Sequence, residues 1–209
     1  MPTRALWAAV LLAALAGGCD EPPEAPPEAE AAPDGPLAEV ADAFDECRAG
    51  DLQRGLRQLD AVVRQSPRDP DALVARGLCR WSWSSTTGDD DDLRGAYQDL
   101  SDAIEAVDGG AESATPLDQI YSRRAYVAQA LDGAWVRALE DLDHAVALAP
   151  GDAGLFLDRA VARRSAGRTA AARADLRRFV ALPDTVLPDR QRVAEALLDD
   201  LERASEPEP

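Results

Sequence analysis

The chain of 209 residues is long enough for one domain of ordinary size with flanking segments. Its 39 acidic and 22 basic residues give a net charge of −17, and every basic residue is an arginine. A surface this negative repels the phosphates of nucleic acids and of anionic lipids, so binding to either is disfavoured. With 5% aromatic residues and many alanines, leucines and arginines, the composition is typical of helices.

Residues 1–18 are typical of an export signal. Arg4 precedes an apolar run, Ala5 to Ala16, that is too short to cross a membrane as a helix. The next residues complete the sequence Ala-Gly-Gly-Cys over 16–19, which resembles the lipobox of bacterial lipoproteins. The resemblance implies that Cys19 receives a diacylglycerol and that the signal is removed just before it. An ordinary secretion signal cut near Gly18 is the alternative.

This resemblance also implies a location. We expect a lipid-anchored protein in the bacterial cell envelope, facing the periplasm, with the covalent lipid on Cys19 as its only added group and no cofactor. Asp20, directly after the cysteine, resembles a signal for retention in the inner membrane of some lineages. The choice between inner and outer membrane stays open at this point.

The segment 19–36 is predicted to be a disordered tether. Between Asp20 and Pro36 it contains six prolines and six acidic residues but no basic residue. It has too little apolar surface to fold, and prolines favour an extended form. At about 3.1 Å per residue the tether would reach about 50 Å from the bilayer. A proline motif that binds a specific ligand is the alternative.

The remainder of the chain repeats at a spacing of 34 residues. One alanine, one aspartate and two leucines recur at this distance: Ala138, Asp141, Leu142 and Leu148 return as Ala172, Asp175, Leu176 and Leu182. The spacing and the closing prolines Pro67 and Pro150 resemble the tetratricopeptide repeat, a pair of helices. With the phase set by these prolines, the predicted repeats cover 36–69, 70–111, 118–152 and 153–186. A capping helix is predicted over 189–204, and a disordered tail over 205–209.

The resemblance implies an all-α fold over 36–204. We expect a right-handed superhelical solenoid of about four helix pairs plus the C-terminal capping helix, because no pair can bury its apolar face alone. Small residues such as Gly55 and Gly77 would let the two helices of a pair approach closely. Gly50, Gly133 and Gly167 are expected at the turns between helices.

An arginine in the first helix recurs with an aspartate in the second helix of three repeats. The separations of 23, 17 and 16 residues become equal when insertions of seven and one residues are subtracted. We interpret each pair as a charge-assisted hydrogen bond that joins the two helices. The predicted pairs are Arg76 with Asp99, Arg124 with Asp141, and Arg159 with Asp175. Three copies spread along a solenoid do not converge on one substrate, which argues against a catalytic role.

No catalytic signature is present in the sequence. It lacks the patterns GxSxG and HExxH and any phosphate-binding glycine loop, and its single histidine, His144, is expected to face solvent. We therefore predict no enzyme activity, no catalytic residue and no metal site. Cys47 and Cys79 either form one disulfide in an oxidising compartment or serve as small core side chains.

An insertion in the second repeat, Ser82 to Asp92, contains four consecutive aspartates. It is predicted to be a solvated loop. A partner contact through Trp83 and a metal site are the alternatives, although adjacent aspartates diverge and do not form the alternating ligand pattern of a calcium loop.

In the tetratricopeptide family the first helices line a concave groove. Here the corresponding places carry few charges and several aromatic rings, which implies that a protein partner binds as an extended peptide or amphipathic helix. The residues that the resemblance places in this groove are Phe44, Arg48, Val74, Leu78, Trp81, Ser122, Tyr126, Gln129, Leu157, Val161 and Arg164. The predicted function is a membrane-anchored scaffold for protein–protein interaction that touches the membrane only through its lipid and binds no nucleic acid. A carrier or sensor of a small ligand or peptidoglycan fragment is the alternative.

Overall fold

The computed structural model describes residues 36–131, 135–181 and 188–203. The predicted export signal, Cys19 and the tether up to residue 35 lie outside the described residues. The same holds for the expected turn at Gly133 and for the predicted tail over 205–209. None of the described helices combines the length and the apolar character that a membrane-spanning helix requires.

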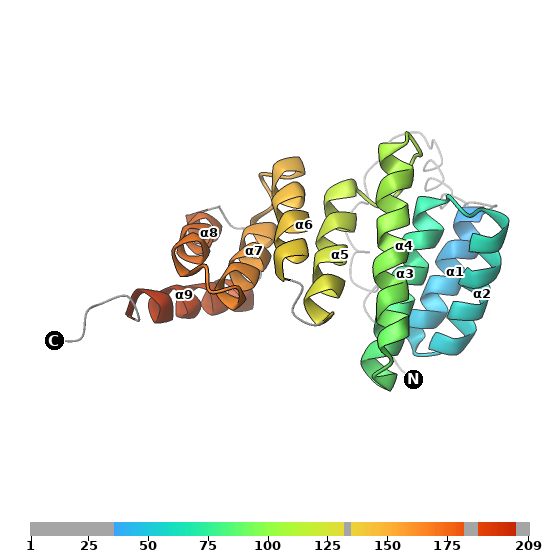
Figure 1. The fold of residues 1–209 in the computed structure, drawn as a ribbon, viewed down its shortest axis with the longest axis horizontal. Helices are drawn as coiled ribbons and strands as arrows, with labels where there is room; N and C mark the ends of the chain where they lie inside the picture. Colours follow the sequence, from blue (N-terminus) through green and yellow to red (C-terminus); the bar gives the residue numbers. More distant parts are fainter. Residues whose placement is uncertain (1–35, 132–134, 182–187, 204–209) are drawn as a thin grey trace, which may run out of the picture. The chain divides into compact units, whose positions relative to one another are not determined.

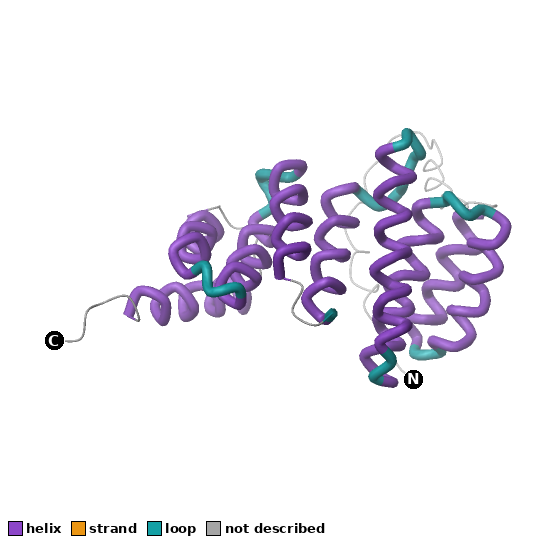
Figure 2. The backbone as a smooth tube through the Cα atoms, in the orientation of Figure 1, coloured by secondary structure: helices purple, strands orange, loops and turns teal. Residues whose placement is uncertain are grey.

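The described parts of the chain consist of nine helices and contain no strand (Figures 1 and 2). Each helix packs against the next one in the sequence, and α1 also packs against α3. The helices are α1 (Pro36–Ala49), α2 (Leu52–Gln65), α3 (Pro70–Thr87), α4 (Asp90–Asp108), α5 (Leu117–Ala130), α6 (Trp135–Leu148), α7 (Ala153–Ser165), α8 (Thr169–Ala181) and α9 (Pro188–Arg203). The predicted fold class, an all-α solenoid of helix pairs with a C-terminal helix, is confirmed.

An aspartate lies directly before the first residue of four of these helices. The side chains of Asp51, Asp69, Asp89 and Asp152 each accept a hydrogen bond from a backbone N–H in the first turn of the following helix. These N–H groups have no partner within the helix, so an aspartate at this position stabilises the helix start. The sequence therefore marks the starts of α2, α3, α4 and α7 locally.

The insertion in the second repeat lengthens two helices instead of forming a loop. α3 continues to Thr87 and α4 begins at Asp90, so that only Gly88 and Asp89 lie between them. Gly88 has a φ of 74°, which suits glycine, and the aspartates after Asp89 occupy the first turn of α4. The predicted solvated loop is wrong, because negative side chains at this place stabilise the positive end of the helix dipole.

Small residues allow the helices of a pair to pack closely. A Cβ atom at Gly55 of α2 would overlap the sulfur of Cys47 and lie 2.7 Å from the carbonyl oxygen of Ala43, so only glycine fits at this crossing. In the next pair, a Cβ atom at Gly77 would lie 3.2 Å from the carbonyl oxygen of Ala96. Alanines from second helices, such as Ala96 and Ala138, are fully buried. The recurring small residues are therefore packing residues.

α9 covers the end of the last helix pair. It packs against α8, and its residues Ala194, Leu197 and Leu201 join the core around Phe179. Val193, which the sequence places on the same apolar side, is instead 59% exposed. The buried side of α9 is therefore narrower than its sequence indicates.

Candidate functional site: the surface of the first helices

All three predicted arginine–aspartate pairs form in the structure. In each of them the arginine Nε donates to one carboxylate oxygen at 3.0–3.1 Å, and Nη2 donates to the other at 2.6–2.8 Å. The pairs are Arg76 with Asp99, Arg124 with Asp141, and Arg159 with Asp175. The aspartates are buried, and this two-point geometry is the strongest that the two groups can adopt. Each pair joins the first and second helices of one repeat.

Each of these arginines also contacts the second helix of the preceding repeat, which the sequence analysis did not predict. Nη1 of Arg76 donates to Asp60 at 3.2 Å, and Nη1 of Arg124 donates to Ser101 at 3.2 Å. Nη1 of Arg159 donates to Asp143 at 2.8 Å. The signal was present, because each acceptor lies two residues after the aspartate position of its own repeat. The guanidinium groups therefore link neighbouring repeats as well as helices.

The charged state of these arginines follows from their partners. Burial alone would lower the pKa of Arg76, Arg124 and Arg159, but the hydrogen bonds and negative charge of the paired aspartates outweigh it and raise the pKa. The groups stay charged and are held by their partners. Their arrangement suits a structural role, not proton transfer.

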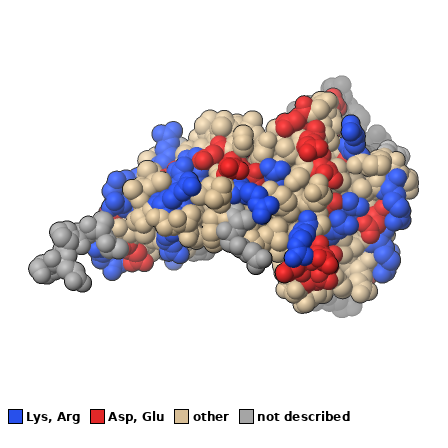
Figure 3. Space-filling view, in the orientation of Figure 1, with Lys and Arg blue, Asp and Glu red and all other residues tan. Residues whose placement is uncertain are grey.

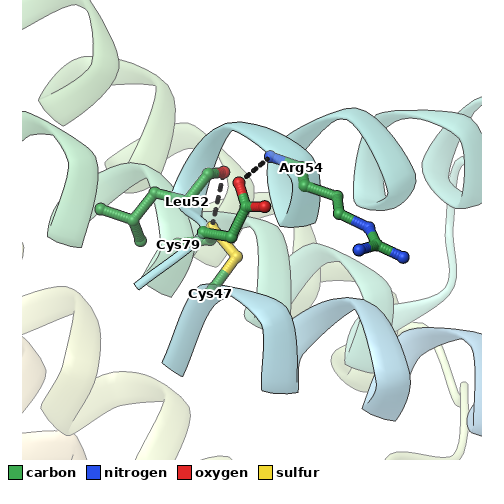
Figure 4. The surroundings of a disulfide bond; sticks show 5 residues. Cys47, Leu52, Arg54 and Cys79 are labelled. Carbon is green, nitrogen blue, oxygen red and sulfur yellow. Dashed lines mark hydrogen bonds between the residues drawn. A yellow bond between two sulfur atoms is a disulfide. The ribbon is translucent and has the colours of Figure 1, made fainter. Parts of the chain in front are cut away.

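A disulfide joins Cys47 of α1 to Cys79 of α3, with the two Cα atoms 5.8 Å apart (Figure 4). Both cysteines are buried. The carbonyl oxygen of Leu52 lies 3.7 Å from the sulfur of Cys79, a van der Waals contact because a disulfide sulfur has no proton to donate. Of the two roles that the sequence left open for these cysteines, the structure contains the disulfide. It ties the first repeat to the second.

The predicted groove residues differ in burial according to their place in the first helix of each repeat. Places are counted from residues 36, 70, 118 and 153, the first residue of each repeat. The fifth place is buried in every repeat, and this includes three predicted groove residues: Val74, Ser122 and Leu157. The prediction that these three line an accessible surface is wrong. Val74 and Leu157 pack into the hydrophobic core, because the fifth place turns towards the neighbouring helices.

The ninth place, in contrast, is at least partly exposed in every repeat, although Phe44 and Leu78 also pack against the hydrophobic core. It is occupied by Phe44, Leu78, Tyr126 and Val161, of which the first three are half-buried and Val161 is 36% exposed. These four apolar or aromatic side chains are called the ninth-place row below. The other predicted groove residues are also accessible: Trp81 and Gln129 are half-buried, and Arg48 and Arg164 are exposed.

A line of contacts that includes Tyr126 of this row connects four helices. The ring of Trp81 in α3 stacks on the ring of Tyr126 in α5, with centroids 6.2 Å apart and planes 10° apart. The side chain of Tyr126 lies close to the carboxylate of Asp158 in α7, whose negative charge acts on it. Arg190 of α9 forms an ion pair with the same carboxylate at 3.0 Å. The four residues are called the aromatic–polar line.

Burial sets the acid–base character of this line. It raises the pKa of Tyr126, and the neighbouring negative charge of Asp158 raises it further. Burial also raises the pKa of Asp158, against the opposing effects of Tyr126 and of the positive charge of Arg190. The tyrosine therefore stays protonated. Sequence reasoning missed Asp158 and Arg190, because the contact spans three repeat units and no local pattern predicts it.

Two other features occupy different parts of the surface. Asp71, near the start of α3, accepts hydrogen bonds from the Ser113 hydroxyl at 2.8 Å and from the backbone N–H of Ala114 at 2.9 Å, which holds the α4–α5 connection against α3. His144 is exposed and stacks on the ring of Tyr121, with centroids 5.0 Å apart. In Figure 3 acidic and basic side chains alternate over the visible face instead of separating into large patches of one sign.

No family model and no curated protein matches the chain. Solved structures do share its fold. The Cut9–Hcn1 hetero-tetramer of the APC/C is 17% identical with a TM-score of 0.64, covering 82% of this chain and 30% of that chain. TTC0263, a thermophilic TPR protein of Thermus thermophilus, is 20% identical with a TM-score of 0.64, covering 79% and 82%. YrrB, described as a TPR protein with an unusual peptide-binding site, is 16% identical with a TM-score of 0.59, covering 82% and 80%. The chain therefore has the fold of a tetratricopeptide-repeat solenoid.

Proposed function

We propose that this protein is a non-catalytic scaffold that binds a protein partner on the surface of its first helices. The observation that carries the proposal is the ninth-place row, a set of partly exposed apolar and aromatic side chains in four successive repeats of an acidic protein. Beside it, Trp81 and Tyr126 offer a stacked pair of rings. Rings of this kind contribute strongly to binding, because they bury much apolar area with little loss of side-chain freedom.

The bound segment is an extended peptide or an amphipathic helix. A row of side chains repeated once per helix pair matches a ligand that presents apolar residues at regular intervals. The same fold in YrrB is described as holding an unusual peptide-binding site, which supports a peptide ligand. A small flat ligand between Trp81 and Tyr126 is not favoured, because their 6.2 Å separation is that of rings in direct contact.

We further propose that the scaffold is held in the bacterial cell envelope by a lipid on Cys19 and faces the periplasm. Residues 16–19 support this through their resemblance to a lipobox. The disulfide between Cys47 and Cys79 supports export, because disulfides form and persist in oxidising compartments such as the periplasm. The tether would then let the solenoid reach partners away from the bilayer.

Crosslinking in the bacterium that carries the protein tests the partner-binding surface. The full chain with Trp81→Ala and Tyr126→Ala is expected to lose the proteins that crosslink to the unmodified chain. The matched control is Trp83→Ala with Tyr121→Ala, which removes the same residue types from the same two helices but at positions pointing elsewhere. Equal recovery with both double variants refutes the proposed surface, and loss only with the control moves the contact to Trp83 or Tyr121.

Cell fractionation tests the anchor. Cys19→Ser is expected to move the protein from the membrane fraction to the soluble fraction, because it removes the acceptor of the acyl chains. Asp20→Ser changes the neighbouring residue and is expected to leave the protein in the membrane fraction. A Cys19→Ser protein that still sediments with membranes rules out the lipid anchor.

A further inference from the structure

The outward side of α2 carries positive charge that is not used inside the protein. Arg54, Arg57 and Arg64 are exposed, and spacings of three and seven residues place them along one side of the helix. The buried residues of α2 lie on the opposite side, where the helix packs against α1 and α3. Arg57 and Arg64 form no ion pair with any described residue, and Arg54 remains 56% exposed in its ion pair with Glu46.

The acidic residues near this side are engaged elsewhere. Asp60 of α2 forms ion pairs with Arg76 at 3.2 Å and Arg80 at 3.7 Å, both on α3. Asp51 and Asp69 accept hydrogen bonds from backbone N–H groups at the starts of α2 and α3. The exposed residues of α2 are all arginine or glutamine: Gln53, Arg54, Arg57, Gln58, Arg64 and Gln65.

α1, the other helix of this pair, has the opposite charge. Its exposed charged residues are three acids and one base: Glu39, Asp42, Asp45 and Arg48. α1 and α2 pack side by side at the N-terminal end of the solenoid (Figure 1). The first helix pair is therefore acidic on one helix and basic on the outer side of the other. An anionic surface attracts the α2 side of this pair and repels the α1 side.

The predicted tether places such a surface near α2. α1 begins at Pro36, directly after the tether, so the first pair is the part of the solenoid closest in sequence to the proposed lipid on Cys19. A tether with a reach of about 50 Å keeps this pair near the bilayer. Exposed charges interact over about 10 Å at physiological salt, so the acidic residues of distant repeats do not cancel the attraction of α2.

We propose that the basic side of α2 binds the anionic headgroups of the bilayer that holds the protein. The guanidinium groups of Arg57 and Arg64 would donate charge-assisted hydrogen bonds to the lipid phosphates. α1, with Phe44 of the ninth-place row, then faces away from the bilayer, where a partner can reach it. Three arginines orient a protein that its lipid already holds, but they are too few to hold it on the membrane alone.

The inference rests on the proposed lipid anchor and departs from one expectation. The sequence predicts contact with the membrane only through the lipid, because a net charge of −17 repels anionic headgroups. The net charge, however, does not show where on the surface the charges lie. Folding gathers the unpaired arginines of α2 on one side and binds the neighbouring aspartates within the protein.

Short-range fluorescence quenching on vesicles provides the test. The lipidated protein is reconstituted into vesicles of phosphatidylglycerol and phosphatidylcholine that contain a lipid with a quencher on its headgroup. A fluorophore is attached to Gln53→Cys on α2 or to Ala41→Cys on α1, both at exposed positions. The engineered cysteine is the free thiol, since Cys47 and Cys79 form a disulfide and the lipid occupies Cys19. Quenching is expected on α2 but not on α1, and it is expected to disappear in vesicles of phosphatidylcholine alone.

Charge reversal measures the contribution of the arginines. Arg57→Glu with Arg64→Glu is expected to lower the ratio of bound to free α2 about tenfold or more, because each arginine near an anionic surface strengthens binding about fivefold. Arg57→Lys with Arg64→Lys keeps both charges and is expected to keep the quenching at Gln53→Cys. The matched control is Arg168→Glu with Arg177→Glu, at two exposed arginines of the last repeat, and it is expected to leave this quenching unchanged.

The outcomes separate this inference from the proposed anchor. If the protein stays on the vesicles but Gln53→Cys is not quenched, or if Arg57→Glu with Arg64→Glu leaves the quenching unchanged, α2 does not bind the bilayer and the anchor stands. Equal quenching at Ala41→Cys, or an equal loss with the last-repeat control, overturns the inference in the same way. If the protein does not remain on the vesicles at all, both the anchor and the inference fail.

Discussion

Three successive junctions of the solenoid hold the same arginine–aspartate pair, and the middle junction differs from the two others in what surrounds the pair. In the α2–α3–α4 junction, Arg76 and Arg80 share the buried Asp99 and both reach Asp60 on the preceding helix. The α6–α7–α8 junction repeats this pattern, with Arg159 and Arg163 on Asp175 and Asp143.

The α4–α5–α6 junction has a single arginine. The position four residues after Arg124, where the other two junctions carry a second arginine, is the buried Ala128. Arg124 is hydrogen-bonded to Asp141 and Ser101, and its guanidinium carbon lies 5.5 Å from the centroid of the Tyr97 ring and 5.5 Å from that of Tyr121. At this junction Ala128 and Ser101 hold the places of the second arginine and second aspartate, and two aromatic rings face the Arg124 guanidinium.

Across the three junctions the number of arginines equals the number of aspartates, although that number differs from one junction to another. Two arginines are hydrogen-bonded or ion-paired to two aspartates in one arrangement, and one arginine to one aspartate in the other. A buried charge without a counter-charge is costly, so an arginine and an aspartate are present or absent together. Ser101, a neutral acceptor, occupies the position that Asp60 and Asp143 hold in the other junctions.

The largest effect is expected for Asp99→Ala. It leaves two partly buried guanidinium groups without their shared partner, which should lower the free energy of unfolding by about 3–5 kcal/mol. Urea denaturation of the full chain measures it. Asp60→Ala, at a side chain that is 39% exposed, is the matched control and should cost at most about 1 kcal/mol. Equal losses for both variants would show that burial of Asp99 does not determine the strength of this junction.

Removal of the disulfide is the next largest change. Cys47→Ala with Cys79→Ala releases a constraint between residues 32 apart and should cost about 2–4 kcal/mol. Hydrogen exchange should show the loss of protection in α1, α2 and α3 first, because contacts in a solenoid are mainly between neighbours. Equal loss of protection in α5 and α6 would indicate that the chain unfolds as a single unit.

Asp141→Ala should lower the melting temperature, with a loss of about 2–3 kcal/mol, because it leaves one partly buried guanidinium unpaired. The loss is smaller than for Asp99→Ala since only one arginine is affected and the rings of Tyr97 and Tyr121 still face its charge. Thermal unfolding of Asp141→Ala and Asp99→Ala checks that the first variant loses less stability. Asp141→Asn, which keeps an acceptor oxygen, is measured beside them. An unchanged melting temperature for Asp141→Ala would contradict the role of the pair.

The smallest effect is expected for Tyr97→Leu. It removes a ring that faces Arg124 at 5.5 Å and Arg137 at 5.4 Å, which should cost about 0.5–1 kcal/mol. Tyr97→Phe keeps the ring and should leave the unfolding temperature nearly unchanged. If Tyr97→Phe destabilises the chain as much as Tyr97→Leu, the hydroxyl rather than the ring supports this junction.

Part of the candidate site was predictable from the sequence. The ninth-place residues Leu78 and Tyr126, together with Trp81, follow from the helical phase of each repeat, and the structure leaves them accessible. The fifth-place residues Val74 and Leu157 were placed on the same surface but are buried, because their exposure depends on how closely adjacent first helices pack. The ion pair between Asp158 and Arg190 joins α7 to α9 and has no local signature.

The sequence by itself determined the helix pairs and their number, because the 34-residue spacing and the aspartates at the starts of helices act over short distances along the chain. It also determined the arginine–aspartate bond within three of the pairs. Only the tertiary structure decided how one repeat meets the next. The contact of Arg76 with Asp60 and the bond between Cys47 and Cys79 both depend on the packing of neighbouring repeats. Periodicity shows which side of a helix is apolar, whereas the angle and distance between two packed helices decide which side chains touch.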